Sequence, residues 1–260
     1  MQTDKVCDYI VHWLTEYSRG AGTQGFVVGI SGGIDSAVTS TLCAKTGFPV
    51  LALNMPIYQA QTQIRLAVRH IAWLEENFVP VQGIDMDLTA PFQALEATFP
   101  PEIQDELTMA NSRSRLRMLT LYAFAGHNRM LVAGTGNKVE DFGVGFFTKY
   151  GDGGVDISPI ADLMKSEVYA LGRYLGVLPE ILDVPPTDGL WADNRSDEDQ
   201  LGASYAELEQ AMHFIEQEKD EHTLSAREQE ILALYRRLHA QNRHKMEPIP
   251  VAIIPDSLRS

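Results

Sequence analysis

The 260-residue sequence contains only two cysteines, Cys7 and Cys43, too few for a disulfide framework or a cysteine metal site. No apolar run approaches the roughly 20 residues that a membrane-spanning helix needs. The first residues, MQTDKVCDYIVHWL, have helical spacing and lack the architecture of a signal peptide. Basic residues are also scarce, with 21 Lys and Arg against 35 Asp and Glu, and a net charge of −14 would repel a nucleic-acid backbone. These absences predict a cytoplasmic protein that has neither a membrane nor a nucleic acid as its partner.

The composition that remains is ordinary for a globular protein, with 45% hydrophobic and 22% charged residues. Up to Pro159, short apolar runs alternate with stretches of helical spacing. The expected strands are Phe26–Ile30, Val50–Leu53, Val79–Ile84 and Met130–Ala133, and the expected helices between them are Ser36–Thr46, Thr62–Asn77 and Asp105–His127. Later helices are expected over Lys165–Leu175, Tyr205–Gln217 and Ser225–Gln241. The pattern predicts an α/β fold: a doubly wound parallel sheet with helices on both faces and a helical C-terminal part, in a single domain over residues 1–260.

The sequence GFVVGISGGIDS, residues 25–36, is the most informative stretch. A glycine-rich turn between a buried strand and a helix exposes backbone N–H groups at the helix N-terminus, where they attract phosphate. Ser31 and Ser36 add hydroxyl donors, and Asp35 places a carboxylate where a phosphate-bound Mg²⁺ needs one. The spacing matches neither the GxxxxGK[ST] loop nor the GxGxxG fingerprint. The stretch predicts a phosphate site at the carboxyl edge of the sheet, and an ordinary glycine-rich turn is the alternative.

The expected helix Asp105–His127 combines apolar residues on nearly every side with several arginines. No Asp or Glu lies in residues 107–139, so Arg113, Arg115 and Arg117 have no local carboxylate partner. Such a helix is expected to be buried, in the core or at a subunit interface, and buried arginines need anions. Arg113 and Arg117 share one flank of the helix, and Arg115 projects to the other. The pattern favours two different anionic partners, with salt bridges to distant carboxylates as the alternative.

A second glycine-rich region, GTGNKVEDFGVGFFTKYGDGGVD, follows the last expected strand. Thr135 can donate a hydroxyl to a nucleotide, and Glu140 can complete a Mg²⁺ site with Asp35, phosphate oxygens and water. The glycines of KYGDGG let the backbone approach a ligand closely, and Asp152 lies among them. A β-turn with Asp152 as a turn residue is the alternative for this run.

Eight pieces of the sequence occur in the order in which one enzyme family has them. They are SGGIDS, NSRSRLRM, GTGNKVE, FFTKYGDGG, the helix start at Lys165, PPT, SDEDQLGASY and the pair His244-Lys245. The first piece resembles the pyrophosphate-binding loop of the Rossmann-like ATP pyrophosphatases, and the whole set resembles the ammonia-dependent NAD⁺ synthetases. The resemblance covers nearly the whole chain. It implies synthesis of NAD⁺ from deamido-NAD⁺ (nicotinic acid adenine dinucleotide), ATP, Mg²⁺ and ammonia, through an acyl-adenylate and with release of AMP and pyrophosphate.

The resemblance also implies the residues of the site. ATP would be bound by Gly29, Ser31, Gly32, Gly33, Asp35, Ser36, Thr135, Lys165 and Thr187. Deamido-NAD⁺ would be bound by Arg115, Lys149, Asp156, His244 and Lys245, and the metal by Asp35 and Glu140. Asp35 and Asp152 are the residues expected to be catalytic, and Asp152 matches an aspartate thought to hold ammonium and help its deprotonation. Residues 140–145 depart from the family because they are one residue longer, which makes Asp141 the alternative to Glu140.

Three further expectations concern assembly, motion and nitrogen source. Family members pair through helices like Asp105–His127, which predicts a homodimer with deamido-NAD⁺ near its interface. The polar stretch Asp188–Gln200 is expected to be a mobile lid without a core anchor. The short segment before SGGIDS and the places of both cysteines predict no glutaminase domain and free ammonia as the substrate. The alternatives are another amide-forming or thiol-transferring ATP pyrophosphatase, or a nucleotide-binding regulator without turnover.

Overall fold

The computed structural model describes residues 1–187, 196–217 and 220–259. Its centre is a four-stranded sheet in the order β3-β2-β1-β4, formed by β1 (Phe26–Gly29), β2 (Val50–Asn54), β3 (Val81–Asp85) and β4 (Leu131–Val132). All neighbouring strands are parallel, with Phe26 beside both Val50 and Leu131. Every residue of β2 is buried, as expected of a parallel strand covered on both faces. The predicted doubly wound parallel sheet is confirmed.

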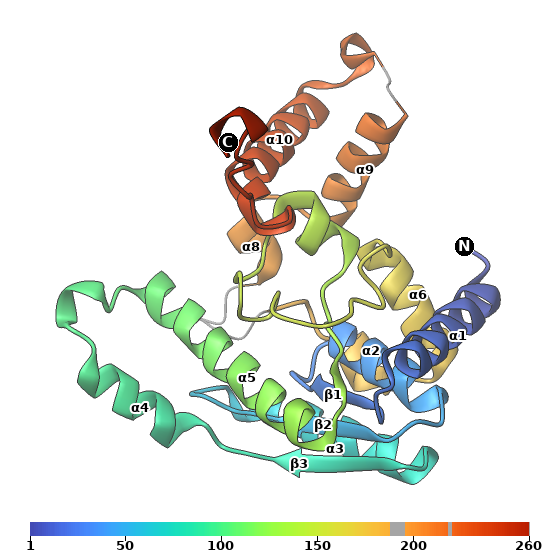
Figure 1. The fold of residues 1–260 in the computed structure, drawn as a ribbon. Helices are drawn as coiled ribbons and strands as arrows, with labels where there is room; N and C mark the ends of the chain where they lie inside the picture. Colours follow the sequence, from blue (N-terminus) through green and yellow to red (C-terminus); the bar gives the residue numbers. More distant parts are fainter. Residues whose placement is uncertain (188–195, 218–219, 260) are drawn as a thin grey trace.

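Alternate residues of β1 belong to two separate cores, because successive side chains of a strand point to opposite faces. Phe26 and Val28 pack on one face, and Val27 packs on the other. The first face is covered by α1 (Thr3–Ala21), α2 (Ile34–Lys45), α3 (Gln61–Asn77) and α6 (Lys165–Leu175). The second face is covered by α4 (Thr89–Thr98) and α5 (Glu106–Asn128), as Figure 1 shows.

A third, smaller core lies away from the sheet (Figure 1). It joins η2 (Val139–Val144), α8 (Asp197–Leu201), α9 (Tyr205–Glu216) and α10 (Ala226–Met246). Reciprocal serine–glutamate capping boxes fix where α9 and α10 begin. The remaining short elements are α7 (Pro179–Leu182), η1 (Pro101–Ile103), η3 (Glu221–Thr223) and η4 (Asp256–Leu258). Within the described residues, none of these helices has both the length and the hydropathy that crossing a bilayer requires.

Two stretches differ from the sequence-based expectations. The helix α4 was not predicted, since its ten residues include a proline and show only one buried side chain, Phe92. Of the expected lid Asp188–Gln200, residues 188–195 lie outside the described part of the chain. At the other end of this stretch α8 forms and buries Asp197, so the expectation of no core anchor is wrong there.

Residues 140–145, the stretch expected from the resemblance to be one residue longer, overlap a π-helix, η2. A π-helical turn contains more residues than an α-helical turn, so it absorbs an added residue while the segments on either side keep their places. Gly145 ends η2 with a φ of 67°, and a Cβ at this glycine would lie 2.4 Å from the Asn242 side chain. The helix α10 packs directly on η2 and therefore holds this π-helical turn in place.

The sequence analysis expected α5 to be buried either in the core of the chain or at a subunit interface. Complete burial in the core is wrong. Met109, Ala110 and Ala125 are buried, but Leu107 and Leu119 are 59% and 62% exposed. Two described contacts of its arginines are with neutral groups: Arg113 lies over the Phe92 ring, and Arg117 Nε donates to Met55 O at 3.0 Å. The other alternative for this helix, a subunit interface, is taken up below.

Candidate active site

The SGGIDS loop leaves the carboxyl end of β1 and leads into α2. Ser31 Oγ and Ser36 Oγ lie 3.1 Å apart, and Gly33 N donates to Ser31 Oγ at 3.2 Å. Gly32 has a φ of +87°, and a Cβ there would lie 2.7 Å from the backbone of α3, so only glycine fits. The loop thus holds two hydroxyls beside the N-terminus of α2, which carries the positive end of the helix dipole.

A pocket opens at this edge of the sheet. It is lined by the first loop, by the ends of β2 and β4, by one side of α5 and by the KYGDGG run. The lining includes most of the residues expected to bind ATP or metal and one expected to act on ammonium: Gly29, Ser31, Asp35, Ser36, Thr135, Glu140, Thr187 and Asp152. Gly32 and Gly33 belong to the same turn but are not among the lining residues. One pocket therefore gathers residues that are far apart in the sequence.

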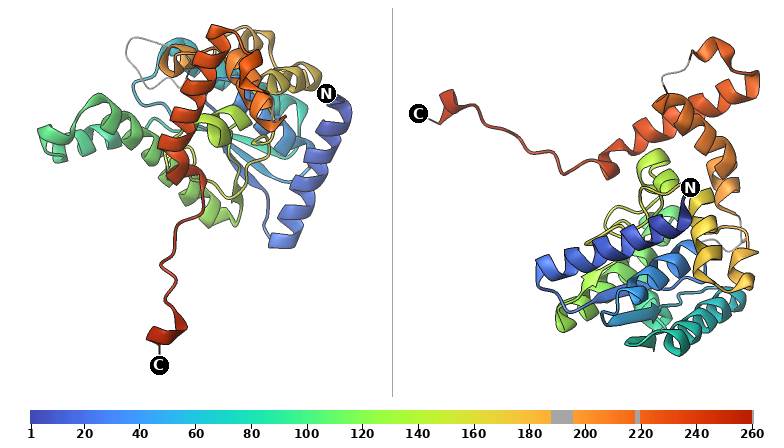
Figure 2. Two further views of the ribbon diagram at one scale, coloured as in Figure 1. Left: turned by 90° about the horizontal axis from the view of Figure 1, so that it is seen from above. Right: turned by 90° about the vertical axis from the view of Figure 1, so that its right-hand side faces the viewer.

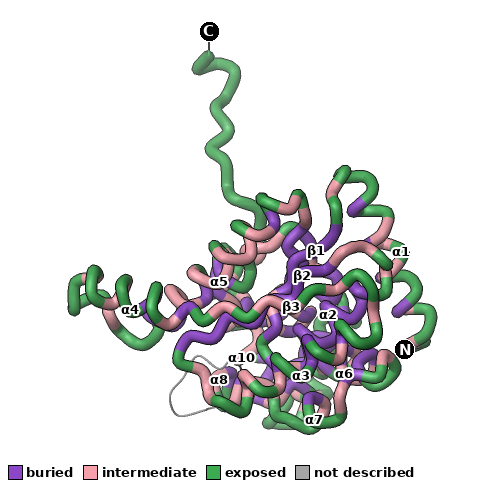
Figure 3. Tube along the Cα trace, turned by 90° about the horizontal axis from the view of Figure 1, so that it is seen from below, coloured by how far each residue is buried: buried purple, intermediate pink, exposed green. Residues whose placement is uncertain are grey.

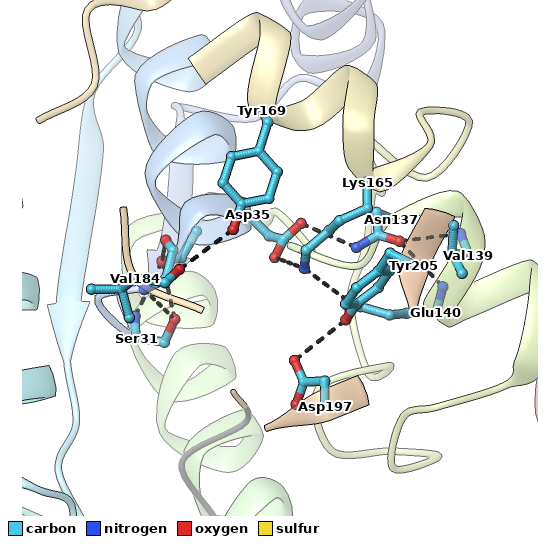
Figure 4. A network of polar contacts seen from close by, with 12 residues as sticks. Ser31, Asp35, Asn137, Val139, Glu140, Lys165, Tyr169, Val184, Asp197 and Tyr205 are labelled. Carbon is cyan, nitrogen blue, oxygen red and sulfur yellow. Dashed lines mark hydrogen bonds and ion pairs between the residues drawn. The ribbon is translucent and has the colours of Figure 1, made fainter. Parts of the chain in front are cut away.

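One buried ammonium and two half-buried carboxylates form the centre of the site (Figure 4). Lys165 Nζ lies 2.7 Å from Asp35 Oδ2 and 2.9 Å from Glu140 Oε1, and the lysine side chain is only 3% exposed. The same ammonium lies 4.7 Å from the centre of the Tyr205 ring. A buried ion pair needs such additional contacts to offset the loss of hydration. Asp35, Glu140 and Lys165, predicted from separate motifs, are thus in direct contact.

Two neutral side chains position this charged triad. Asn137 is fully buried; its Nδ2 donates to Asp35 Oδ1 at 3.1 Å, and its Oδ1 accepts from the backbone N–H of Val139 and of Glu140. The Tyr205 hydroxyl donates to Glu140, and it also lies 3.3 Å from Asp197 Oδ2. The sequence analysis missed these roles. The motifs that contain these residues were noted, since Asn137 lies in GTGNKVE, and Asp197 and Tyr205 lie in SDEDQLGASY.

The protonation of the triad follows from this geometry. Burial favours the neutral forms, but the two carboxylates outweigh it and raise the pKa of Lys165, so the ammonium stays charged. Burial likewise opposes ionisation of Glu140, but the Lys165 charge and the Tyr205 hydrogen bond lower the pKa of that carboxyl below its usual value. For Asp35, burial is the stronger influence and raises the pKa. The ionised form is therefore favoured more strongly at Glu140 than at Asp35.

Asp152 also lines the pocket and is tied to α5. Its Oδ1 accepts from Ser114 Oγ at 2.7 Å and from Thr148 N at 2.9 Å. Gly151 passes so close to Ser114 that a Cβ would lie 2.4 Å from Ser114 Oγ. Burial raises the pKa of Asp152, although these hydrogen bonds oppose the shift. The turn alternative for KYGDGG is also present, and the aspartate lines the pocket while part of the residue is exposed to solvent.

The residues expected to bind deamido-NAD⁺ form a separate group. Lys149 Nζ donates to His244 O, Lys245 Nζ to Phe147 O at 2.7 Å, and Arg115 Nη2 to Lys149 O at 3.4 Å. We call Arg115, Lys149 and Lys245 the cation cluster; it connects α5, the loop after η2 and the end of α10. Asp156 is not part of it, because its carboxylate accepts from Tyr122 OH at 3.0 Å and from Val132 N at 2.8 Å and so fixes the edge strand β4.

The sequence analysis expected Asp35 and Glu140 to bind Mg²⁺, and the structure shows which oxygen donors lie there. Among the described residues there is no group of three or more His, Cys, Asp or Glu placed to hold a metal ion. Asp35 and Glu140 are two hard oxygen donors on one pocket wall, which suits Mg²⁺ because this ion usually takes one or two carboxylates and completes its shell with phosphate and water. Glu140 shares Lys165 with Asp35, whereas Asp141 packs against Gly136. This arrangement favours Glu140 over Asp141.

The comparison with known proteins agrees with the motifs. The model of the family described as NAD synthase matches residues 6–249. The chain belongs to the NAD synthase family. A relative from Carboxydothermus hydrogenoformans named NH(3)-dependent NAD(+) synthetase is 40% identical over 211 residues, which are 79% of this chain and 82% of the relative. The resemblance to the ammonia-dependent NAD⁺ synthetases is confirmed, and the chain is a ligase that forms a C–N bond.

Two solved structures share the fold over nearly all of the chain. The NMN synthetase from Francisella tularensis has a TM-score of 0.84 and 33% identity, and the match covers 98% of this chain and 99% of that one. The NH3-dependent NAD synthetase from Campylobacter jejuni, solved with nitrate, has a TM-score of 0.80 and 26% identity, covering 97% and 100%. Family membership thus extends across both the sheet and the C-terminal helices.

Proposed function

We propose that the chain makes NAD⁺ by ATP-dependent amidation of deamido-NAD⁺ with ammonia, through an acyl-adenylate, releasing AMP and pyrophosphate. The observation that carries this proposal is a single pocket lined by the SGGIDS loop, by Glu140 and by Asp152, in which the carboxylates of Asp35 and Glu140 hold the buried Lys165 ammonium. A phosphate-binding turn, a charge-neutralising centre and a second carboxylate are what successive nucleotidyl transfer and amide formation require.

ATP binding is assigned to the loop side of the pocket. The hydroxyls of Ser31 and Ser36 and the backbone of Gly29, Gly32 and Gly33 would hold the phosphates at the N-terminus of α2. Thr135 and Thr187 line the same pocket and would contact the nucleotide, and Lys165 would neutralise phosphate charge. Asp35 and Glu140 would hold Mg²⁺, which when bound neutralises the leaving pyrophosphate.

The chemistry has two balanced steps. A nicotinate carboxylate oxygen attacks the α-phosphorus of ATP; the bond between the α-phosphorus and the bridging oxygen breaks, and pyrophosphate leaves. Ammonia then attacks the acyl carbon, the bond to AMP breaks, and an amide forms. Asp152 is proposed to hold ammonium and accept its proton before the attack. A carboxylate whose pKa is raised is a stronger base, which suits this role.

The cation cluster, with His244 and Asp156, is the proposed binding region for deamido-NAD⁺. Its ammonium and guanidinium groups suit the phosphates and the carboxylate of this dinucleotide. We also propose a cytoplasmic homodimer that pairs through α5, because the apolar side chains of this helix remain exposed in the single chain. Free ammonia is the proposed nitrogen source, so activity is expected to rise with pH as the unprotonated fraction grows.

A second candidate substrate follows from the likeness to the Francisella NMN synthetase. Amidation that yields NMN starts from nicotinic acid mononucleotide, which carries the same reacting carboxylate but lacks the AMP half. Adenylation and amidation at this carboxylate would be the same reactions for both substrates. The cation cluster is the part of the site that would contact the additional nucleotide, and it favours the dinucleotide.

One assay tests both candidates. Purified protein is given ATP, Mg²⁺ and ammonium with deamido-NAD⁺, with nicotinic acid mononucleotide or with neither, and AMP and pyrophosphate are measured. We expect AMP only when the carboxylate substrate is present, with deamido-NAD⁺ preferred. A preference for the mononucleotide would reassign the substrate, and no substrate-dependent AMP would contradict the proposed function. Glutamine in place of ammonium is expected to give no amide.

A further inference from the structure

The helix α9 contacts both segments that bring the charged triad together. The right-hand view of Figure 2 shows α9 and α10 as a pair of helices above the body that surrounds the sheet. Buried residues gather mainly around the strands (Figure 3), whereas α9 packs at the edge of the site, against α6 and η2. Lys165 is the first residue of α6, and Glu140 lies in η2. The position of α9 therefore bears on both sides of this ion pair.

One face of α9 makes these contacts. Four of its side chains are spaced three or four residues apart, which places them on the same side of the helix: Tyr205, Glu209, Met212 and Glu216. Two of them contact η2, since the Tyr205 hydroxyl donates to Glu140 and the Met212 sulfur would lie 3.1 Å from a Cβ at Gly143. This part of the face supports the segment that carries Glu140.

Glu209 is the member of this face that contacts α6. Its Oε1 accepts from Ser166 N at 2.8 Å, and its Oε2 accepts from Ser166 Oγ at 2.7 Å. The first N–H groups of a helix have no partner within the helix, and a carboxylate is favoured there by the positive end of the helix dipole. Glu209 therefore caps α6 from a second helix, at the residue directly after Lys165.

This cap fixes the turn of α6 from which the triad ammonium projects. Glu167 Oε2 accepts from Met164 N at 3.0 Å and closes the turn locally, whereas Glu209 ties it to α9. Lys165 Nζ has to lie within hydrogen-bonding distance of two carboxylates at once, at 2.7 and 2.9 Å. Displacement of a reacting or charge-stabilising group by about 1 Å can lower a rate by about 10²-fold. The first turn of α6 is thus a part of the fold whose exact place matters for chemistry.

We propose that Glu209 is a positioning residue for the reaction: it holds the first turn of α6 against α9, so that the Lys165 ammonium stays between Asp35 and Glu140. The inference rests on the proposed role of Lys165 in neutralising phosphate charge. Glu209 is not among the residues that line the pocket, so its effect is carried by α6. The C-terminal helices thereby help to set the geometry of a site built at the edge of the sheet.

Steady-state kinetics test this role. Glu209→Ala removes both hydrogen bonds to Ser166 and is expected to lower kcat about tenfold, with the KM for deamido-NAD⁺ nearly unchanged, because Lys165 acts on the ATP phosphates. Glu209→Gln is expected to restore kcat to within about threefold of the original chain, since an amide can accept from Ser166 N and donate to Ser166 Oγ. Ile231→Val is the control, because it loosens the buried third core on α10 and leaves the cap intact. Its kcat is expected to stay within about twofold.

Hydrogen exchange supplies a readout that does not depend on activity. The Ser166 amide loses its acceptor in Glu209→Ala, so it is expected to exchange at least about tenfold faster than in the original chain. In Ile231→Val its exchange is expected to change by less than about threefold. All variants are compared at a temperature at which circular dichroism shows them to be folded.

The outcomes separate the cap from the reaction. A kcat for Glu209→Ala equal to that of Ile231→Val, a loss in Glu209→Gln as large as in Glu209→Ala, or unchanged exchange of the Ser166 amide would each overturn the proposal, even if the original chain is fully active. Faster exchange in Glu209→Ala, together with an original chain that releases no substrate-dependent AMP, would instead contradict the proposed function and leave the tie between α9 and α6 standing.

Discussion

The cations on the two sides of the candidate site have different partners. Beside the SGGIDS loop, the Lys165 ammonium is 3% exposed and is paired with the carboxylates of Asp35 and Glu140. In the cation cluster, Lys149 and Lys245 donate instead to the carbonyl oxygens of His244 and Phe147. A carbonyl oxygen accepts a hydrogen bond without cancelling the charge, so the cluster retains positive charge for an anionic substrate.

This difference indicates what each side contributes. The Lys165 ammonium is already held between two carboxylates before any ligand binds, so breaking the triad should damage both folding and chemistry. The cation cluster has hydrogen bonds but no carboxylate partner among its described contacts, so its loss should weaken substrate binding and leave the fold intact. The substitutions below test this contrast and the separate role of Asp152, beginning with the largest expected effect.

Replacement of Asp35 by alanine should reduce adenylate formation by about 10³-fold or more, because it removes a metal ligand and half of the anionic partner of Lys165. Substrate-dependent AMP production measures the effect, with circular dichroism to verify folding. Glu140→Ala should behave similarly, whereas Asp141→Ala should be mild. If Asp141→Ala is the damaging change of the two, the metal assignment is displaced by one residue.

Lys165→Met should destabilise the protein by roughly 3 kcal/mol, because it leaves two half-buried carboxylates without their cation. Urea denaturation gives the free energy of unfolding, and AMP production should be lost as well. Lys245→Met is the matched control, since it removes the same charge from the cation cluster. Its effect on the free energy of unfolding should stay within about 1 kcal/mol. Equal destabilisation by the two changes would remove the proposed contrast.

The sheet was predictable from the sequence because buried parallel strands are short apolar runs, and β1 to β4 coincide with such runs within about two residues. Asp35 and Glu140 could be named because they lie in short motifs near strand ends, whereas Lys165 and the residues of the cation cluster followed from the resemblance to the family. Their contacts could not be foreseen: Lys165 reaches Asp35 and Glu140 only through the docking of α6. Asn137 and Tyr205 were missed as positioning residues, since an amide and a phenol carry no charge pattern to reveal them.

Asp152→Asn should impair amide formation by about 10²-fold while leaving adenylation near normal, because it removes a base and keeps the side-chain shape. Substrate-dependent exchange of labelled pyrophosphate into ATP measures adenylation, and NAD⁺ formation measures the whole reaction. Ser114→Ala is a useful companion, since it removes the 2.7 Å hydrogen bond to Asp152 without removing the carboxylate. A parallel loss of exchange and NAD⁺ formation in Asp152→Asn would exclude a role confined to ammonia.

Lys245→Met should raise the KM for deamido-NAD⁺ by roughly tenfold and leave kcat and the KM for ATP nearly unchanged, as expected for loss of one charge-assisted contact. Lys149→Met should act in the same direction. Lys5→Met, an exposed change on α1, controls for altered net charge. An effect on the KM for ATP alone would place the cation cluster on the wrong substrate.

The acyl-adenylate is the central claim, and isotope transfer tests it most directly. Deamido-NAD⁺ labelled with ¹⁸O in the nicotinate carboxylate is converted with ATP and ammonium, and the products are analysed by mass spectrometry. If the carboxylate attacks the α-phosphorus, one labelled oxygen must leave with AMP when ammonia displaces it, and pyrophosphate must remain unlabelled. Unlabelled AMP, or label in a phosphate released from the γ-position, would contradict the mechanism.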